Sequence, residues 1–403
     1  MGKVLLIASV SPMIEAFNKG NLEILQQLGN EVHVAANFYE EDEELYEQNK
    51  QFKRWLQERH VKVYDLPIQR SPLAKENWQA YQQLKKIVER EQYTMVHAHS
   101  PIGGVLARLA GRKARKNGMN ILYTAHGFHF FKGAPMKNWL LYYPIEKMLS
   151  RWTDCLITIN PEDYKRAKEK AFDAEEIAYV NGVGIDLSKF APTDTIKRKR
   201  LRNWYGFSKE AFIMIYVGEL SYRKNQKFAL EMMPSLLKRV PNALLLLVGE
   251  GDARGELEQM IQEKGLENHV KLLGFRTDIP ELMSLSDTAI SCSRQEGLPV
   301  NVMEAMATGL PVVVSNCRGN RDLVEHNHNG FVFPQEEVEE IVNRLERLAY
   351  SPELCQRFGR VNRKVIEPFA AEQVDQAMEK IYRKYMTAEE PEHAEPANSY
   401  KET

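Results

Sequence analysis

Three things are scarce in this 403-residue chain: cysteine, an excess of either charge, and long hydrophobic runs. The four cysteines (Cys155, Cys292, Cys317 and Cys355) are widely spaced and include no CxxC pair. They therefore predict neither a disulfide framework nor a zinc site, and they suit a reducing cytoplasm. The 54 Lys and Arg residues balance 55 Asp and Glu residues, which argues against a nucleic-acid partner. Because no apolar run approaches the ~18 residues that span a bilayer, we expect a cytoplasmic protein that is soluble or peripheral at the membrane.

Short apolar runs rich in β-branched residues recur along the chain and alternate with longer helical stretches. Near-continuous apolar strands of this kind are typical of parallel sheets that helices cover on both faces. Two such series in one chain predict an α/β protein with two doubly wound, Rossmann-like domains whose sheets face a cleft. The expected strands begin near Val4, Glu31, Val61, Met95, Ile121, Cys155, Phe212, Ala243, Val270, Thr288, Pro311 and Gly330.

A segment with Gly, Asp and Pro around residues 180–195 breaks both periodicities and predicts a domain boundary there. We expect an N-terminal domain over residues 1–183 and a C-terminal domain over residues 184–366. An amphipathic helix over residues 367–385 is expected to pack back on the first domain. Residues 387–403 are acidic and poor in large apolar side chains, which predicts a disordered tail.

The segment EGLPVNVMEAMATGLPVVVS carries the most specific motif of the chain. Glu296 precedes a turn of Gly297, Leu298 and Pro299, and Glu304 follows eight positions after Glu296. If a helix begins directly after the turn, the first carboxylate lies in the loop before it and the second on its face. Backbone N–H groups at the helix start then form an anion site between two carboxylates. A nucleotide-sugar matches that combination, and an ordinary amphipathic helix with two solvated carboxylates is the alternative.

The segment VGELSYRKNQ places charged side chains directly after an expected strand. Arg223 and Lys224 are candidate catalytic cations, because cations aimed at a diphosphate leaving group stabilise the charge that builds up on it. Gly218, Glu219 and Asn225 are neighbouring candidates for donor contacts. A solvated basic turn is the alternative interpretation.

Three further strand ends supply candidates, since ligands of open α/β sheets bind beyond the carboxyl ends of the strands. In TAHGFHFF, His126 ends a strand and is a candidate catalytic residue that orients a sugar, with a buried core histidine as the alternative. Gly249 in VGEGDARGELE superficially resembles a dinucleotide fingerprint, but the third glycine comes too late, so we reject an NAD site. Phe275 and Arg276 are candidates for contacts to a base, with core packing of Phe275 as the alternative.

The first domain offers candidates for an acceptor side. Ser11 and Met13 follow the first strand, and of His97 and His99 we expect one in the core and one in the cleft. The helix ARLAGRKARKNG predicts docking on anionic lipid, although cations at a helix C-terminus are also favourable by themselves. Its basic residues are Arg108, Arg112, Lys113, Arg115 and Lys116.

The E-x7-E spacing, the loop from Gly218 to Lys224, the TAHGFHFF segment and the order of strands and helices resemble the retaining GT-B glycosyltransferases of family 4. The likeness covers essentially residues 1–385 and is nearest to the subgroup of bacterial capsule and exopolysaccharide clusters. It implies transfer of a hexose or N-acetylhexosamine from a nucleoside diphosphate sugar, with UDP expected, to a lipid-linked glycan. It further implies retention of anomeric configuration, no metal or other cofactor, an acceptor-side first domain and a donor-binding second domain.

The resemblance also implies roles for individual residues of the second half. Arg223 and Lys224 would bind the diphosphate, assisted by backbone N–H groups near Leu298 and Pro299. The other implied contacts are Glu304 to the ribose, Glu296 to a sugar hydroxyl, His126 to the sugar pocket, and Gly249, Phe275 and Arg276 to the nucleotide.

Two departures from the family pattern keep other functions open. Glu219 occupies the position at which the family commonly has an arginine, and Ser11 and Met13 stand where many members have a glycine pair. The first departure favours a non-catalytic nucleotide-sugar-binding partner of a polysaccharide assembly. A UDP-N-acetylglucosamine 2-epimerase of the same fold is the second alternative, and the intact motif from Glu296 to Glu304 argues against it.

Overall fold

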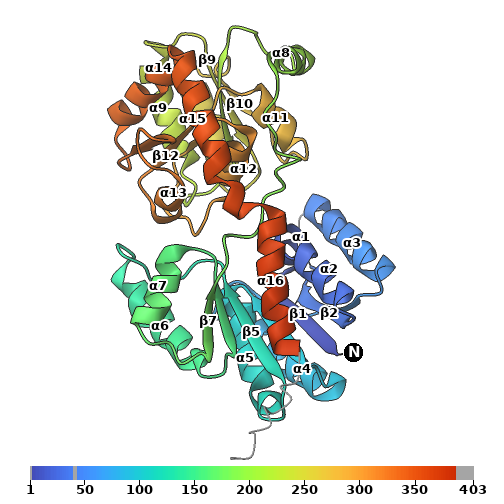
Figure 1. Cartoon of the computed structure of the whole chain (residues 1–403). Helices are drawn as coiled ribbons and strands as arrows, with labels where there is room; N and C mark the ends of the chain where they lie inside the picture. Colours follow the sequence, from blue (N-terminus) through green and yellow to red (C-terminus); the bar gives the residue numbers. More distant parts are fainter. Residues whose placement is uncertain (1, 40–42, 387–403) are drawn as a thin grey trace, which may run out of the picture. The chain divides into compact units, whose positions relative to one another are not determined.

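The computed structural model describes residues 2–39 and 43–386 of the chain (Figure 1). It divides into two compact units. Of the described residues, one unit contains those up to Tyr123, Trp152–Asp154 and residues 376–386, and the other contains Thr124–Arg151 and Cys155–Asp375. The predicted boundary at residues 183 and 184 stays a prediction, and the tail expected over residues 387–403 lies outside the described residues.

The strands form a seven-stranded sheet in the order β3-β2-β1-β4-β5-β6-β7 and a six-stranded sheet in the order β10-β9-β8-β11-β12-β13. The pairings of β1 with β2 and β4, and of β8 with β9 and β11, run parallel, so each sheet is wound outward in both directions from a central strand. This confirms the predicted α/β class with two Rossmann-like sheets. The strands are β1 (Lys3–Val10), β2 (Glu31–Asn37), β3 (Lys62–Asp65), β4 (Met95–His99), β5 (Asn120–Ala125), β6 (Cys155–Thr158), β7 (Glu176–Tyr179), β8 (Phe212–Val217), β9 (Ala243–Val248), β10 (Val270–Leu272), β11 (Thr288–Ser291), β12 (Val312–Ser315) and β13 (Gly330–Phe333).

Helices follow most of the strands, as the alternating pattern predicts. Among the described residues, no helix combines the length and the apolar character needed to cross a membrane. The helices are α1 (Ser11–Phe17), α2 (Lys19–Gln27), α3 (Glu43–Glu58), α4 (Glu76–Glu91), α5 (Pro101–Arg115), α6 (Met136–Ser150), α7 (Pro161–Glu169), α8 (Thr195–Trp204), α9 (Gln226–Leu237), α10 (Arg254–Glu263), α11 (Ile279–Leu285), α12 (Val300–Thr308), α13 (Arg318–Leu323), α14 (Val338–Ala349), α15 (Pro352–Val365) and α16 (Ala371–Met386), with a 3-10 turn at Glu367–Phe369.

All twelve expected strands are present, and the sequence missed only β7 among the described strands. Central strands were easy to find because both of their faces are covered, as in β1, where Val4, Leu5 and Ile7 have no exposed surface. Strand β7 is an edge strand with the sequence EIAY, and all four of its residues are partly exposed. It therefore lacks the continuous apolar run on which the prediction depended.

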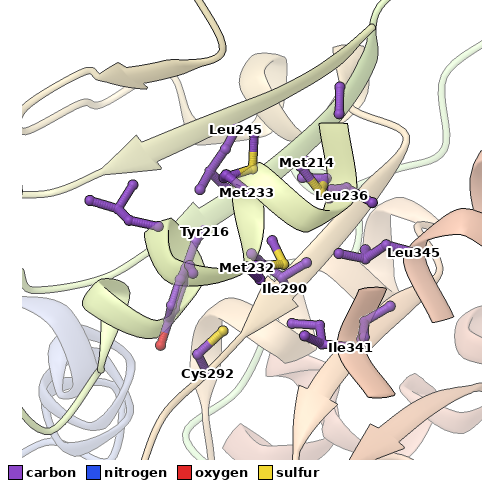
Figure 2. Close-up of a cluster of buried hydrophobic side chains, with 14 of the residues drawn as sticks. Met214, Tyr216, Met232, Met233, Leu236, Leu245, Ile290, Cys292, Ile341 and Leu345 are labelled. Carbon is purple, nitrogen blue, oxygen red and sulfur yellow. The ribbon is translucent and has the colours of Figure 1, made fainter. Parts of the chain in front are cut away.

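The second sheet is held between two layers of helices, and Figure 2 shows part of the core on one side. There, Met214 and Tyr216 of β8 pack among side chains of α9 and α14, while α11 and α12 cover the opposite face. Because this packing fixes the strands, the loops at their carboxyl ends have a rigid base. The labelled core residues are Met214, Tyr216, Met232, Met233, Leu236, Leu245, Ile290, Cys292, Ile341 and Leu345.

Candidate functional site

Helix α12 begins directly after the turn at residues 297–299, as predicted, so Glu296 lies in the preceding loop and Glu304 on the helix. Pro299 caps the helix with an extended backbone and supplies no side-chain acceptor. Gly309, at φ +80°, ends the helix in the left-handed region that glycine adopts without strain. The positive end of the α12 dipole therefore meets the loop that carries Glu296.

Glu296 is buried and is surrounded by hydrogen-bond donors. Its Oε1 accepts from Lys224 Nζ at 2.6 Å and from Ser293 Oγ at 2.7 Å. Its Oε2 accepts from Arg223 Nη1 at 3.2 Å. Burial alone would raise the pKa of Glu296, but the charges of Lys224 and Arg223 and the two shorter hydrogen bonds outweigh it and hold the pKa below its usual value. Glu296 is therefore a carboxylate that fixes two cations at the end of the second sheet.

A buried hydroxyl pair supports this cluster from beneath. Tyr216 at the end of β8 lies 2.9 Å from Ser293, oxygen to oxygen, and its hydroxyl also donates to the backbone oxygen of Lys224. Ser315 at the end of β12 donates to the Ser293 carbonyl at 2.5 Å. Residues at the ends of three neighbouring strands thus fix the loop of Lys224 and the loop of Glu296 relative to each other.

The two cations differ in what they can still bind. Lys224 is 8% exposed, and its ammonium has three donors, of which Glu296 takes one. The side chain of Arg223 is 46% exposed, and its guanidinium keeps donors beyond the one directed at Glu296. Glu219, at the position of the missing family arginine, forms an exposed ion pair with Arg223 at 3.8 Å. The site therefore presents two adjacent cations with spare donors, which is the requirement for binding a diphosphate.

Glu304 is half-buried on α12. Burial raises the pKa of Glu304 to about 7, although the charge of Lys189 opposes the shift. Within the described part of the chain, no side chain forms a hydrogen bond or ion pair with this carboxylate. A desolvated carboxylate with spare acceptor capacity fits a hydroxyl-bearing ligand.

The loop of His126 lies against the turn of Gly297. A Cβ on Gly297 would come within 2.4 Å of the His126 carbonyl oxygen, so only glycine permits this approach. Burial lowers the pKa of His126 to about 4, and the imidazole is therefore neutral near pH 7. The structure thus brings the backbone of the strand-end histidine against the turn of the second-half motif, whereas the role of the His126 side chain stays a prediction.

A buried ion pair that the sequence did not single out fixes the contact between the loop of His126 and the turn of Gly297. Arg318 Nη1 donates to Asp163 Oδ1 at 2.7 Å, and both side chains are almost fully buried. Arg318 also donates to the carbonyl oxygens of Glu296 at 3.3 Å and Phe128 at 3.4 Å. Its guanidinium lies 4.7 Å from the ring centroid of Phe131. The strand-end rule could have found Arg318 and Asp163, since each lies in the segment that directly follows a strand.

The candidates for the nucleotide lie on neighbouring loops of the second sheet. The Gly249 N–H donates to Gly274 at 2.8 Å, and a Cβ on Gly249 would come within 2.2 Å of the Gly218 carbonyl oxygen, so three strand-end loops touch. Phe275 is 48% exposed, which rules out the core-packing alternative. Arg276 is bound through two nitrogens to Asp278, at 2.8 and 2.5 Å.

Leu298 and Asn225 have surroundings of another kind. The Leu298 side chain packs in the core on the α12 side of the second sheet, so only the backbone of Leu298 faces the loop before α12. Asn225 is buried with a left-handed backbone, and it lines a cavity of about 410 Å³ together with Tyr222, Glu256 and Arg294. Lys224 and Glu296 do not line that cavity.

The acceptor-side candidates belong to the other compact unit. Ser11 is fully buried and donates to Asn49 Oδ1 at 2.6 Å, whereas Met13 is partly exposed. His97 and His99 are both buried, with ring centroids 4.1 Å apart. The expectation of one core and one cleft histidine is therefore wrong, because side chains two residues apart on a strand lie on the same face.

The predicted basic docking patch needs correction. Arg108 is 1% exposed, donates through Nε to the Gly104 carbonyl at 2.8 Å and lies over the ring of Tyr123. Arg115 is bound to Asp154 at 2.8 Å. Helix periodicity turns these two arginines inward, so only Arg112, Lys113 and Lys116 of the five are exposed.

Among the residues described, no cluster of three His, Cys, Asp or Glu side chains could hold a metal ion.

Comparison with known families accounts for both halves of the chain. The family described as Glycosyltransferase Family 4 matches residues 22–189, and the family described as Glycosyl transferases group 1 matches residues 197–365. "Putative glycosyltransferase EpsD" of Bacillus subtilis (strain 168) is 40% identical over 384 residues, which are 95% of this chain and 97% of that protein.

One further relative and one solved structure of similar fold extend the comparison. The UDP-Gal:alpha-D-GlcNAc-diphosphoundecaprenol alpha-1,3-galactosyltransferase of Escherichia coli is 32% identical over 273 residues, covering 66% of this chain and 68% of the relative. Anabaena Alr3699/HepE in complex with UDP and glucose superposes with a TM-score of 0.74 at 21% identity, covering 95% of this chain and 100% of the other.

Proposed function

Because the chain belongs to the family 4 GT-B glycosyltransferases and is a transferase enzyme, we propose that it moves a hexose or N-acetylhexosamine from a UDP-sugar to a lipid-linked glycan, with retention of anomeric configuration. The observation that carries the proposal is the pair of cations, Lys224 and Arg223, that Glu296 fixes beside the start of α12. Such a site binds a diphosphate and stabilises the charge it gains on departure.

The donor is assigned from the residues around those cations. Lys224 and Arg223 take the diphosphate, and Glu304, eight residues after Glu296, accepts from the ribose hydroxyls. His126 is neutral and can orient the sugar without repelling the positive charge that develops at the anomeric carbon. The Alr3699/HepE structures contain UDP and UDP-glucose, which supports uracil as the base for this chain.

The proposed reaction exchanges one glycosidic bond for another on the same face of the sugar. The bond between the anomeric carbon and the diphosphate oxygen breaks, and the acceptor oxygen bonds to that carbon. The acceptor proton passes to an oxygen of the departing phosphate. This route assigns no covalent intermediate to an enzyme side chain and no role to a metal, and Glu296 acts by holding Lys224 and Arg223 in place and contacting a sugar hydroxyl.

The named relatives support the acceptor and the location that we propose. The Escherichia coli relative acts on a diphosphoundecaprenol-linked sugar, and EpsD is similar to this chain over nearly its whole length. We therefore assign this chain to bacterial cell-surface polysaccharide synthesis at the cytoplasmic face of the membrane.

Glu219 supports the second candidate function, a non-catalytic nucleotide-sugar-binding partner, because it occupies the usual place of an arginine.

The test combines binding and turnover on the full chain. UDP and a panel of UDP-, GDP- and ADP-sugars are screened for an increase in the thermal midpoint, which a ligand of the native state produces without an acceptor. Sugars that bind are then incubated with GlcNAc-diphosphoundecaprenol, and NMR of the product determines the anomeric configuration. Binding without transfer to any lipid-linked acceptor would favour the non-catalytic partner, and release of a 2-epimeric sugar without an acceptor would favour the epimerase.

A further inference from the structure

Helix α6 leaves a broad apolar face uncovered. Met136 is 72% exposed, Leu140 74%, Leu141 49%, Ile145 36% and Met148 45%. Five of the fourteen large apolar side chains that are exposed among the described residues thus lie on one helix of fifteen residues. The remaining nine are scattered singly or in pairs over the chain, which is ordinary for a folded protein, whereas this clustering is not.

The apolar face is a stable feature of a well-anchored helix. At 100° per residue the five side chains lie within about half of the helix circumference, and the buried residues Glu146 and Leu149 lie on the other half. On that inner side, the ring of Tyr143 packs against Phe130 with centroids 5.4 Å apart. The helix is therefore held by its inner face, and the exposure of the outer face is not the result of a loosely packed segment.

The exposed charges on α6 and on the residues directly next to it in sequence have one sign. Lys132, Lys137 and Arg151 are exposed and Lys147 is half-exposed, whereas Glu146, the only acidic residue between Lys132 and Arg151, is buried. At 100° per residue Lys137, Lys147 and Arg151 lie on the same half of the circumference as the apolar side chains, toward the two ends of the helix, so that one face combines apolar groups with cations, as suits the interface of an anionic bilayer. In a symmetric contact between two copies, the same cations would face one another, so the charge pattern opposes self-association through this face.

We infer that α6 docks the enzyme on an anionic membrane surface, with Leu140, Leu141 and Ile145 at the level of the lipid tails and the flanking cations at the headgroups. The inference rests on the proposed function, because a lipid-linked acceptor confines the reaction to a membrane. It also moves the docking site from the helix predicted by sequence, where Arg108 is buried, to one whose apolar side chains are exposed.

Sedimentation of the full chain with lipid vesicles tests the inference. We expect binding to phosphatidylcholine vesicles that contain phosphatidylglycerol, and at least about tenfold weaker partitioning for the double variant Leu140→Glu/Ile145→Glu. Leu73→Glu is the matched control, since Leu73 is 93% exposed outside α6 and should leave partitioning unchanged. The variant Lys137→Glu/Arg151→Glu should lose the preference for vesicles with phosphatidylglycerol over vesicles without it.

Equal partitioning of wild type and Leu140→Glu/Ile145→Glu would overturn the inference. So would a wild-type dimer in sedimentation velocity that this double variant converts to a monomer, because the face would then belong to a second copy. A short-chain, water-soluble acceptor separates docking from chemistry: the double variant should keep wild-type turnover on it and lose turnover on the acceptor embedded in vesicles. If wild type transfers to neither acceptor, the proposed function fails, whereas the vesicle result still decides whether α6 docks.

Discussion

Lys224 Nζ lies 2.6 Å from Oε1 of Glu296, and both side chains are largely buried. The pair joins the first strand-end loop of the second sheet to the loop before α12. A buried carboxylate without a cation would be strongly unfavourable, and so would a buried cation without a carboxylate. Each residue therefore positions the other, and the site exists only when both loops are in place.

Removing one partner of this pair should cost both stability and activity. We expect Lys224→Met to lower the free energy of unfolding by about 3–5 kcal/mol, because it leaves the Glu296 carboxylate buried and without its closest cation. Lys224→Met/Glu296→Gln should recover much of that loss and still lack transferase activity. Urea unfolding with activity assays checks both points, and additive losses in the double variant would contradict the coupling.

The same pair should respond to acid. The pKa of Glu296 is lower in the folded protein than the ordinary value of 4.5. Its contribution to stability is therefore fully present above pH 4.5 and is lost as the pH falls through the lower folded value. We expect the stability difference between wild type and Glu296→Gln to narrow below pH 4.5 in denaturation curves measured across that range. A difference that stays constant down to the acid transition would show that Glu296 is not held ionised by its neighbours.

Glu304 should make donor binding depend on pH near neutrality, unlike Glu296, whose effect is confined to acid. Burial raises its pKa to about 7, and only the ionised carboxylate accepts hydrogen bonds from both ribose hydroxyls. The affinity for a UDP-sugar, whose diphosphate diester does not titrate here, should therefore rise roughly tenfold between pH 6 and pH 8. Glu304→Gln should abolish that dependence and weaken binding at pH 8 by about 1.5–3 kcal/mol. Calorimetric titrations at both pH values decide this, and unchanged affinity in the variant would remove the ribose assignment.

The sequence predicted most of the fold because parallel strands buried on both faces leave an unmistakable apolar signal, and it missed β7, an edge strand without one. It also placed Glu296, Glu304 and Lys224 correctly with respect to their strands and helix. It could not predict that Arg318 would meet Asp163, since such a contact joins the first turns of two helices at positions 155 residues apart. The inward turn of Arg108 was missed because charge alone does not reveal which helix face packs on the sheet.

The Arg318–Asp163 pair should prove structural, with a secondary effect on catalysis. Asp163→Asn leaves the Arg318 guanidinium buried without its counter-charge, and we expect a loss of about 3–5 kcal/mol in unfolding free energy. Because Arg318 also holds the Glu296 carbonyl, turnover should fall with little change in donor affinity. Arg166→Met is a suitable control, since the Arg166–Glu162 pair lies on the same helix and is partly exposed. Comparable destabilisation by both variants would show that the buried Arg318–Asp163 pair contributes no more to the free energy of unfolding than the partly exposed Arg166–Glu162 pair.

Gly297 should tolerate no side chain, whereas another glycine of the same unit should accept one. Gly297→Ala places a Cβ within 2.4 Å of the His126 carbonyl oxygen, so the two loops must separate and carry Glu296 away from the sugar side. We expect a large loss of turnover together with lower stability. Gly255 in α10 has no atom near an added Cβ, and Gly255→Ala should stabilise the protein by about 0.5–1 kcal/mol, because alanine is the better helix former. Thermal unfolding and initial rates of both variants give the answer: wild-type activity in Gly297→Ala would mean that the approach of His126 to the motif is not needed for catalysis.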